Sequence, residues 1–307
     1  MSQPLPKAPQ SDGGLATLAL ALTAFSLFAI GDAASKLIVI ESNAVVAMWG
    51  RSVVFAALFL FILRPGEWRT ALTHGPVKLL LLRSIFPFLA GSCVIFAMAY
   101  VPLAQLTTIL FISPLLSMAL GKLLLGETVN RWGWLAVLSG FLGVLTIMRP
   151  FGGDFSWTLL IPALAGLLAA FGQVMTRIVA QRTAPRTVLF YTMLVALVLS
   201  SLPLPFFWQA PTGEQWLLFG LSGICQAAGQ FAMIAAYARA TASRLAPYSY
   251  AQLLTATLLG FAIFGEVPDI FTVVGAALIV AGGLISLHLA GRRPKPPDEA
   301  ERAAPTD

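Results

Sequence analysis

The stretch GDAASKLIV (residues 31–39) places Asp32 and Lys36 inside a segment that otherwise reads as membrane-spanning. A charged side chain at bilayer depth is costly and rarely lacks a partner. The apolar run around it, from about residue 15 to residue 40, is longer than the apolar region of a signal peptide. The segment therefore predicts a retained transmembrane helix that carries a buried charged pair.

The composition supports the same class of protein. Apolar residues make up 58% of the 307 residues and charged residues only 10%, whereas a soluble domain carries roughly 25% charged residues. We therefore expect an all-α integral membrane protein whose partners are the lipid bilayer and a small-molecule substrate. The net charge of +6 comes from basic residues that punctuate apolar runs, which argues against nucleic-acid binding. The two histidines lack metal-ligand spacing, and the two cysteines lie in apolar segments as packing residues, so we expect no metal, no cofactor and no disulfide framework.

A spanning helix needs about 20 mainly apolar residues. Ten segments of the chain fit this requirement: 15–37, 45–63, 77–99, 102–125, 131–149, 157–180, 187–207, 215–237, 243–265 and 268–290. The division between the third and fourth segments is the least defined. The tails, residues 1–14 and 292–307, are polar and rich in proline, which predicts disorder.

The positions of the basic residues predict the orientation, because loops rich in lysine and arginine stay on the cytoplasmic side. With the N-terminus inside, the inner loops and span ends collect Lys7, Arg64, Arg69, Lys78, Lys122, Arg131, Arg182, Arg186, Arg239, Arg244, Arg292, Arg293, Lys295 and Arg302. The outer side keeps Arg149 and the acidic Glu41, Asp154, Glu214, Glu266 and Asp269. We expect a multi-pass protein of the inner membrane with both termini in the cytoplasm.

The two halves of the chain, 15–150 and 151–291, resemble each other. GDAASKLIV (31–39) aligns with GQVMTRIVA (172–180), which pairs Gly31 with Gly172, Asp32 with Gln173, Ser35 with Thr176 and Lys36 with Arg177. LLLGETVNRWGWLAVLSGFLGVL (123–145) aligns with AIFGEVPDIFTVVGAALIVAGGL (262–284), and both contain a Gly-Glu pair at an expected helix end. Apolar sequences align easily by chance, but two polar anchors in the same order within each half favour a repeat.

Five spans per half force the second half to enter the membrane from the opposite side. Inverted repeats of this kind are an architecture of secondary transporters, which bind substrate near the membrane midplane. The pattern therefore predicts a transporter fold of two inverted five-helix repeats, without indicating the substrate.

The chain resembles the EamA-type members of the drug/metabolite transporter superfamily. The resemblance is carried by GDAASK (31–36), WGRS (49–52), LLLRS (80–84), the Gly-Glu pairs, APYSYAQL (246–253) and FGEVPD (264–269). It covers about residues 15–290 and is similar in detail to the branch that contains S-adenosylmethionine and riboflavin carriers. The resemblance implies alternating-access transport of a small organic metabolite, such as S-adenosylmethionine, a vitamin, a nucleoside or an amino-acid-like compound.

Asp32 and Lys36 lie four residues apart and share a helix face, so they can pair. Arg51 lies at a similar depth in the next span, because Asp32 precedes the intervening turn by about ten residues and Arg51 follows it by about eight. We therefore expect a triad Lys36–Asp32–Arg51 in the outer third of the membrane. It serves either as a static cluster that fixes helix packing or as a site where Asp32 changes protonation and a cation binds an anionic substrate group.

Further polar residues extend the candidate site. Arg83 is close enough to the cytoplasmic side to snorkel, and the alternative is a cation that faces the cavity and attracts a carboxylate or phosphate. Gln226 and Gln230 share a face, and tyrosines nearby could complete a cavity for a planar metabolite, although polar side chains also join helices. The candidate substrate-binding residues are Asp32, Lys36, Arg51, Arg83, Gln173, Gln226, Gln230, Tyr237, Tyr248, Tyr250 and Gln252.

The other classes considered are a membrane-embedded enzyme and a non-transporting sensor or scaffold. The spans contain no nucleophile–base pair, no paired carboxylates and no histidine cluster, so we expect no enzymatic activity and no catalytic residue. Glu127 and Glu266 are expected to satisfy turns at helix ends rather than to act in transport. Substrate identity, the direction and coupling of transport, and the choice between monomer and homodimer stay open.

Overall fold

The structure is a computed structural model that describes residues 15–62, 76–126, 129, 131–150, 156–180, 183, 185–237 and 246–290. Regular structure within these residues is helical throughout. The helices are α1 (Leu15–Glu41), α2 (Ala44–Ile62), α4 (Val77–Ala97), α5 (Leu103–Leu110), α6 (Ser113–Leu125), α7 (Arg131–Met148), η1 (Trp157–Leu159), α8 (Leu160–Ala180), α9 (Pro185–Ser201), α10 (Leu204–Phe207), α11 (Gly213–Tyr237), η2 (Ala246–Ser249), α13 (Tyr250–Phe264) and α14 (Ile270–Ala290).

Helices occupy each of the ten ranges predicted to span the membrane, and in some ranges two short helices follow each other, as α5 and α6 do. Five stretches are long and apolar enough to cross a membrane: Leu15–Glu41, Val77–Ala97, Leu103–Leu125, Arg131–Met148 and Trp157–Thr176. Shorter apolar helical stretches are Ala44–Leu60, Thr187–Ser201, Tyr250–Phe264 and Ile270–Ile285. The all-helical class is thus confirmed, and the apolar helical stretches agree with the predicted membrane protein.

Proline and glycine set several helix ends. Pro76 and Pro102 stand directly before α4 and α5, where a missing backbone N–H costs no helical hydrogen bond. Gly126 and Gly265 follow α6 and α13 with φ angles of 68° and 66°, a left-handed conformation that glycine adopts without strain. The two Gly-Glu motifs therefore begin in the same way, as turns that leave a helix.

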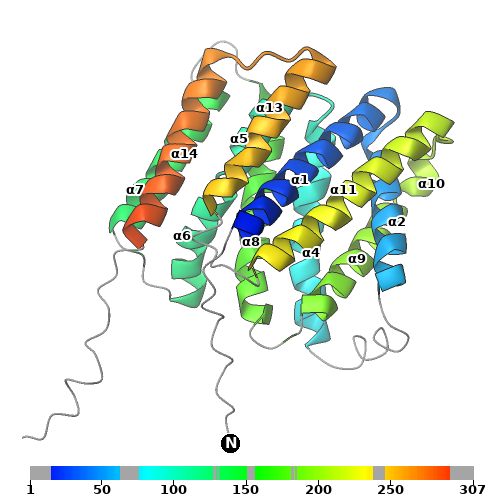
Figure 1. Ribbon diagram of the computed structural model, residues 1–307, viewed down its shortest axis with the longest axis horizontal. Helices are drawn as coiled ribbons and strands as arrows, with labels where there is room; N and C mark the ends of the chain where they lie inside the picture. The colour runs from blue at the N-terminus through cyan, green and yellow to red at the C-terminus, as the bar shows by residue number, and fades with distance from the viewer. Residues whose placement is uncertain are drawn as a thin grey trace, which may run out of the picture.

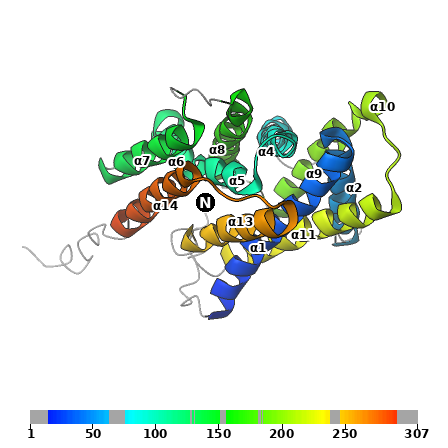
Figure 2. The same ribbon diagram turned by 90° about the horizontal axis from the view of Figure 1, so that it is seen from above.

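The helices form two rows, and α1 and α11 lean across the more upright α4 and α8 (Figure 1). Seen from above, α14, α13, α1 and α11 make one row, and α7, α6, α8, α4 and α9 make the other (Figure 2). Helix α2 contacts α11 and α9 and so closes one end, while α5 contacts both α13 and α8. The contacts α1–α11–α2–α9–α4–α8–α5–α13–α1 complete a ring, and the α7–α14 pair lies beside it.

Helix α1 of the first half and helix α8 of the second half each pack on helices of the opposite half. Helix α1 packs on α11 and α13, and α8, which holds the aligned sequence, packs on α4 and α6. A Cβ atom on Gly31 would lie 3.3 Å from Cβ of Cys225 on α11, and a Cβ atom on Gly172 would lie 3.2 Å from Cδ of Pro87 on α4. These distances leave little room, so the two aligned glycines permit two corresponding close helix contacts.

The α7–α14 contact has the same reciprocal character. A Cβ atom on Gly143 of α7 would lie 2.7 Å from the backbone oxygen of Gly275 on α14. A Cβ atom on Gly282 of α14 would lie 2.9 Å from the backbone oxygen of Ala136 on α7. The two backbones therefore approach closely at both ends of one contact, as small residues allow in membrane helices.

The outer surface of the bundle suits a lipid environment. Large apolar side chains such as Leu135, Leu138 and Phe141 on α7 are exposed, and extended apolar surfaces of this kind indicate contact with another apolar phase. Exposed tryptophans lie toward both ends of the helices: Trp157, Trp208 and Trp216 at the end where α1 terminates, and Trp132 and Trp134 at the other. Tryptophan is enriched at both membrane–water interfaces.

Candidate functional site

A buried ion pair lies at the end of the molecule where α1 terminates, which we call the Glu41 end. Lys36 is 5% exposed at its side chain and pairs with the Glu266 carboxylate. Its ammonium group also donates a hydrogen bond to the Val101 carbonyl at 3.1 Å and lies 5.0 Å from the centre of the Phe264 ring. The other carboxylate oxygen of Glu266 accepts the backbone N–H of Leu103 at 2.8 Å.

The local sequence explains this placement of Glu266. Gly265 turns the chain in the left-handed conformation as α13 ends, and the N–H of Glu266 then bonds the Gly260 carbonyl at 3.0 Å. The carboxylate caps the first N–H of α5, where a negative charge is favoured by the exposed helix donors. Lys36 completes the contact from α1. Three connected parts of the ring are thus held together at the Glu41 end, which is the upper end in Figure 1.

The predicted triad is therefore wrong in one member. Asp32 does pair with Arg51, with 3.5 Å between Oδ1 and Nη1, and this joins α1 to α2. Lys36 instead extends to Glu266, because its long side chain reaches a carboxylate from a turn more than 200 residues away in sequence. Glu266 follows the end of α13, as expected, but its carboxylate caps α5 and pairs with Lys36 instead of satisfying its own turn. Glu127 lies outside the described residues.

Arg83 does not snorkel toward the end of α4. Its Nε donates to the Thr176 hydroxyl of α8 at 2.9 Å, and its Nη1 donates to the Thr192 hydroxyl of α9. The side chain is thus fixed between three helices, and the snorkelling prediction is wrong because two hydroxyls bind two of the guanidinium N–H groups inside the bundle. Ser35, which aligns with Thr176, makes the corresponding bond from α1 to α11, at 2.7 Å from the Ser222 hydroxyl.

The predicted glutamines are only partly engaged. Gln173 donates to the Ser113 hydroxyl at 3.3 Å, which links α8 to α6. Gln226, Gln230 and Gln252 are half-buried, and no hydrogen bond joins their side chains to any residue that the structure describes. The side-chain amides of these three glutamines are therefore free, within the described residues, to bind a ligand, but their positions do not identify that ligand.

Two of the predicted tyrosines, Tyr248 and Tyr250, make different contacts. Tyr250 donates to the Val280 carbonyl of α14 at 3.3 Å and packs against the Phe111 ring. Tyr248 packs instead with Ala21 near the start of α1. The side chain of Tyr237 lies outside the described residues.

A second polar contact lies at the Glu41 end. Arg149 follows α7 with a positive φ of 47°, a conformation that costs a non-glycine residue free energy. Its guanidinium pairs with Asp269 and lies 3.8 Å from the centre of the Phe271 ring. These contacts offset the backbone cost and join α7 to the chain entering α14.

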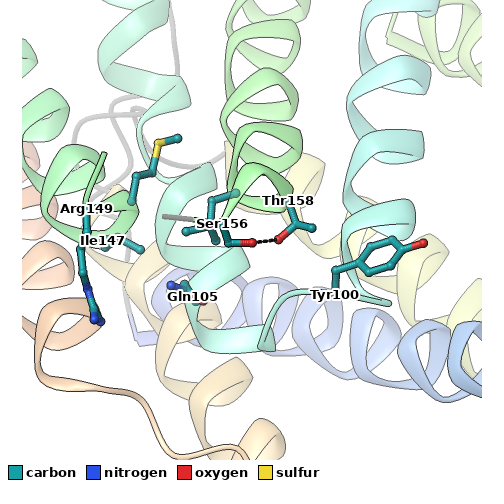
Figure 3. A pocket seen from close by; sticks show the side chains of 8 residues that line it. Tyr100, Gln105, Ile147, Arg149, Ser156 and Thr158 are labelled. Carbon is teal, nitrogen blue, oxygen red and sulfur yellow. Dashed lines mark hydrogen bonds between the residues drawn. The ribbon is translucent and has the colours of Figure 1, made fainter. Parts of the chain in front are cut away.

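A cavity of about 160 Å³ opens beside this contact and is lined by Tyr100, Gln105, Ile147, Met148, Arg149, Ser156, Thr158 and Leu159. Figure 3 shows the hydrogen bond between the Ser156 and Thr158 hydroxyls, 2.7 Å long, with Arg149 on one side and Tyr100 on the other. The cavity contains none of the residues predicted from the sequence to bind substrate. It lies close to the contacts that hold the Glu41 end together.

Sequence reasoning missed the role of Glu266 as the partner of Lys36. The charges of the predicted triad were the available signal, because Asp32 alone had to balance the two cations Lys36 and Arg51. A second carboxylate was available in each Gly-Glu motif at an expected helix end. No sequence signal placed Val101 and Leu103 beside Lys36, because those contacts depend on backbone atoms of a turn.

Comparisons with known proteins agree with this architecture. The model of the EamA-like transporter family matches residues 15–149 and again 156–287. The chain is 34% identical over 202 residues to a riboflavin transporter of Vibrio cholerae, with 65% of this chain and 68% of the relative covered. It is 25% identical over 208 residues to an S-adenosylmethionine uptake transporter of Rickettsia bellii, with 68% and 72% covered. A solved crystal structure with 21% sequence identity superposes with a TM-score of 0.62 over 90% of this chain and 98% of the other, which reports on the fold alone.

Proposed function

Because the chain belongs to the EamA-like transporter family, we propose that it is a secondary transporter that moves a small organic metabolite across the inner membrane by alternating access. Family membership makes it a multi-pass membrane transporter rather than an enzyme. Relatives named for riboflavin and S-adenosylmethionine favour vitamins and nucleoside-like compounds as the first substrates to test.

The proposed architecture is ten membrane helices in two inverted repeats, residues 15–150 and 151–291. Two features support it. The family model matches the chain twice, once in each half. The aligned residues Gly31 and Gly172 make corresponding close contacts, and so do the aligned hydroxyls of Ser35 and Thr176. With both termini in the cytoplasm, the Glu41 end faces outward.

The observation that carries the alternating-access mechanism is the buried pair of Lys36 and Glu266. A carrier must close one side of the membrane while the other is open. The pair joins α1 to the α13–α14 connection and, through Leu103, to the start of α5. We assign it to a state closed at the Glu41 end, and access from that side requires the pair to separate.

The proposed substrate site lies inside the ring and begins about one helical turn below the Lys36–Glu266 pair, as seen from the Glu41 end. It includes the Asp32–Arg51 pair, Arg83 and Gln173, with Gln226 and Gln230 on the facing helix. Charged and polar residues at membrane depth usually mark a substrate pathway. Lys36 acts in closure on this assignment, and Tyr250 acts in packing against α14.

Two measurements on the purified protein test the function. Binding is measured as thermal stabilisation in detergent across S-adenosylmethionine, riboflavin, nucleosides and amino acids, since a ligand at about 100 times its Kd stabilises by roughly 2.7 kcal/mol. Transport is then measured as counterflow of the stabilising compound in proteoliposomes. We expect saturable counterflow with wild-type protein and none with Asp32→Asn. Counterflow at an unchanged rate in Asp32→Asn would show that the Asp32–Arg51 pair is not part of the substrate site.

A further inference from the structure

Arg83 differs from the other charged residues inside the bundle. It lies six residues after Val77, the first residue of α4, so its backbone is about 9 Å from the start of the helix. Its guanidinium contacts α8 and α9 through two threonine hydroxyls and is half-buried. A cation held at this depth normally pairs with a carboxylate or faces a polar pathway.

The two threonines hold the guanidinium in one orientation. The Thr176 hydroxyl donates its own proton to the Gly172 carbonyl at 2.6 Å, and the Thr192 hydroxyl donates to the Val188 carbonyl at 2.8 Å. Each hydroxyl therefore offers only lone pairs to Arg83. The close packing of Gly172 on α4 fixes the distance between α4 and α8 at this level. A guanidinium that is already oriented loses less entropy when it binds.

Within the described residues, no carboxylate balances the charge of Arg83. Lys36 pairs with Glu266 and Arg51 pairs with Asp32, but no carboxylate among the described residues lies within ion-pair distance of Arg83. Of its five N–H groups, two are used by the threonines. The other three have no hydrogen-bond partner within the described part of the chain. Nη2 and the second proton of Nη1 together present the fork that binds two oxygens of a carboxylate or phosphate.

We propose that Arg83 is the residue that binds an oxyanion, and that the transported metabolite carries a carboxylate or phosphate group. The proposal rests on the proposed transport function and narrows its substrate class. Neutral hydroxyls orient the cation without neutralising it, so the attraction for an incoming anion is retained. The headgroup of an anionic lipid offers the same oxyanion, and the experiment separates the two sources.

The test compares wild-type protein with Arg83→Gln, purified as full-length chains in neutral detergent. Lys78→Gln is the matched control, because it removes the same charge from an exposed position of the same helix. The probes form pairs that differ in the oxyanion: riboflavin 5′-phosphate against riboflavin, AMP against adenosine, and succinate against succinamide. Inorganic phosphate and phosphatidylglycerol, with diacylglycerol as its counterpart without phosphate, are added separately. Binding is measured as the shift in melting temperature with probe concentration.

We expect at least one soluble oxyanion to stabilise wild-type and Lys78→Gln protein saturably. Its Kd rises about 10- to 100-fold in Arg83→Gln, as expected for lost hydrogen bonds to a charged group. Arg83→Lys keeps the charge and recovers part of the affinity. If Arg83→Gln does not fold, Thr192→Val keeps the cation, removes one anchor and should weaken the same probe to a smaller extent.

Three outcomes overturn the proposal: no probe in the set binds, the oxyanion probe binds Arg83→Gln as well as wild type, or the neutral member of the pair binds equally well. Stabilisation by phosphatidylglycerol alone, lost in Arg83→Gln, supports the oxyanion site and assigns it to lipid instead of substrate. The proposed transport function is overturned by a different result, namely that no compound that binds gives counterflow. Counterflow of a neutral compound that is unaffected in Arg83→Gln overturns the Arg83 proposal and leaves the transporter standing.

Discussion

Replacing Glu266 by glutamine should destabilise the protein strongly, because it leaves a buried cation behind. The substitution keeps the shape of the side chain and an oxygen that can still accept the Leu103 N–H. Lys36, 5% exposed, then keeps only the Val101 carbonyl and the Phe264 ring as partners. Removing one member of a buried ion pair costs about 3–5 kcal/mol, and we expect a loss in the free energy of unfolding of this order.

A double-mutant cycle separates the ion pair from the other contacts of these residues. Lys36→Met removes the other charge and keeps an apolar chain of similar length. Replacing both members of a buried pair is often close to neutral, so the double variant should be more stable than Glu266→Gln alone. We expect a coupling between the two substitutions of about 2–3 kcal/mol, at the upper end for residues in contact.

The assay is thermal unfolding of the purified variants in detergent, with Glu214→Gln as control. Glu214 is an exposed acid in the first turn of α11 at the same end of the molecule, so its replacement tests loss of charge without loss of the pair. The reasoning is refuted if Glu266→Gln has the same melting temperature as Glu214→Gln and wild type. It is also refuted if the effects of Glu266→Gln and Lys36→Met add without coupling. On the proposed mechanism the pair separates during the transport cycle, so Glu266→Gln should alter the counterflow rate whereas Glu214→Gln should not.

Other substitutions probe the remaining contacts. Asp32→Asn should abolish counterflow and lower the melting temperature less than Glu266→Gln, because its contact with Arg51 is long, at 3.5 Å; normal counterflow would reduce that pair to a packing role. Gly143→Ala should cost about 1–3 kcal/mol as α7 is pushed from α14, since its Cβ would lie 2.7 Å from a backbone oxygen. Gly220→Ala, with nothing within 4 Å of the new Cβ, should be neutral or stabilising by up to about 1 kcal/mol, and equal melting of the two glycine variants would contradict the packing argument. Arg149→Gln should cost less than about 1 kcal/mol, because both members of its ion pair are partly exposed, and a larger loss in melting temperature would show that the pair is more than a surface contact.

The sequence predicted the helices well because the signal was strong and local. Apolar runs of about 20 residues, bounded by proline or glycine, need no knowledge of tertiary contacts to be recognised. The Asp32–Arg51 pair was also predictable, since a short turn joins α1 to α2 and fixes the relative depth of the two residues. The Gly-Glu motifs identified two helix ends, and both glycines adopt the left-handed conformation there.

The contacts that failed to be predicted depend on helices distant in sequence. Lys36 meets Glu266 because α1 packs on α13 across the ring, and no spacing rule within one helix contains that information. Arg83 was expected to reach toward water because it lies near the start of α4. Its actual position depends on hydroxyls of α8 and α9, which are distant in sequence from α4. Tyr250 turned out to pack against Phe111, because the orientation of α13 is set by its contacts with α1 and α5.

The reciprocal contact between α7 and α14 bears on how such a chain could arise. On the proposed alignment of the halves, Gly143 corresponds to Gly282 and Ala136 corresponds to Gly275. The contact of Gly143 with Gly275 is then the counterpart of the contact of Gly282 with Ala136. An interface in which equivalent surfaces meet is isologous, as in a two-fold symmetric homodimer. A five-helix ancestor could therefore have assembled as an antiparallel pair through this surface, and gene fusion would have preserved an interface that already existed.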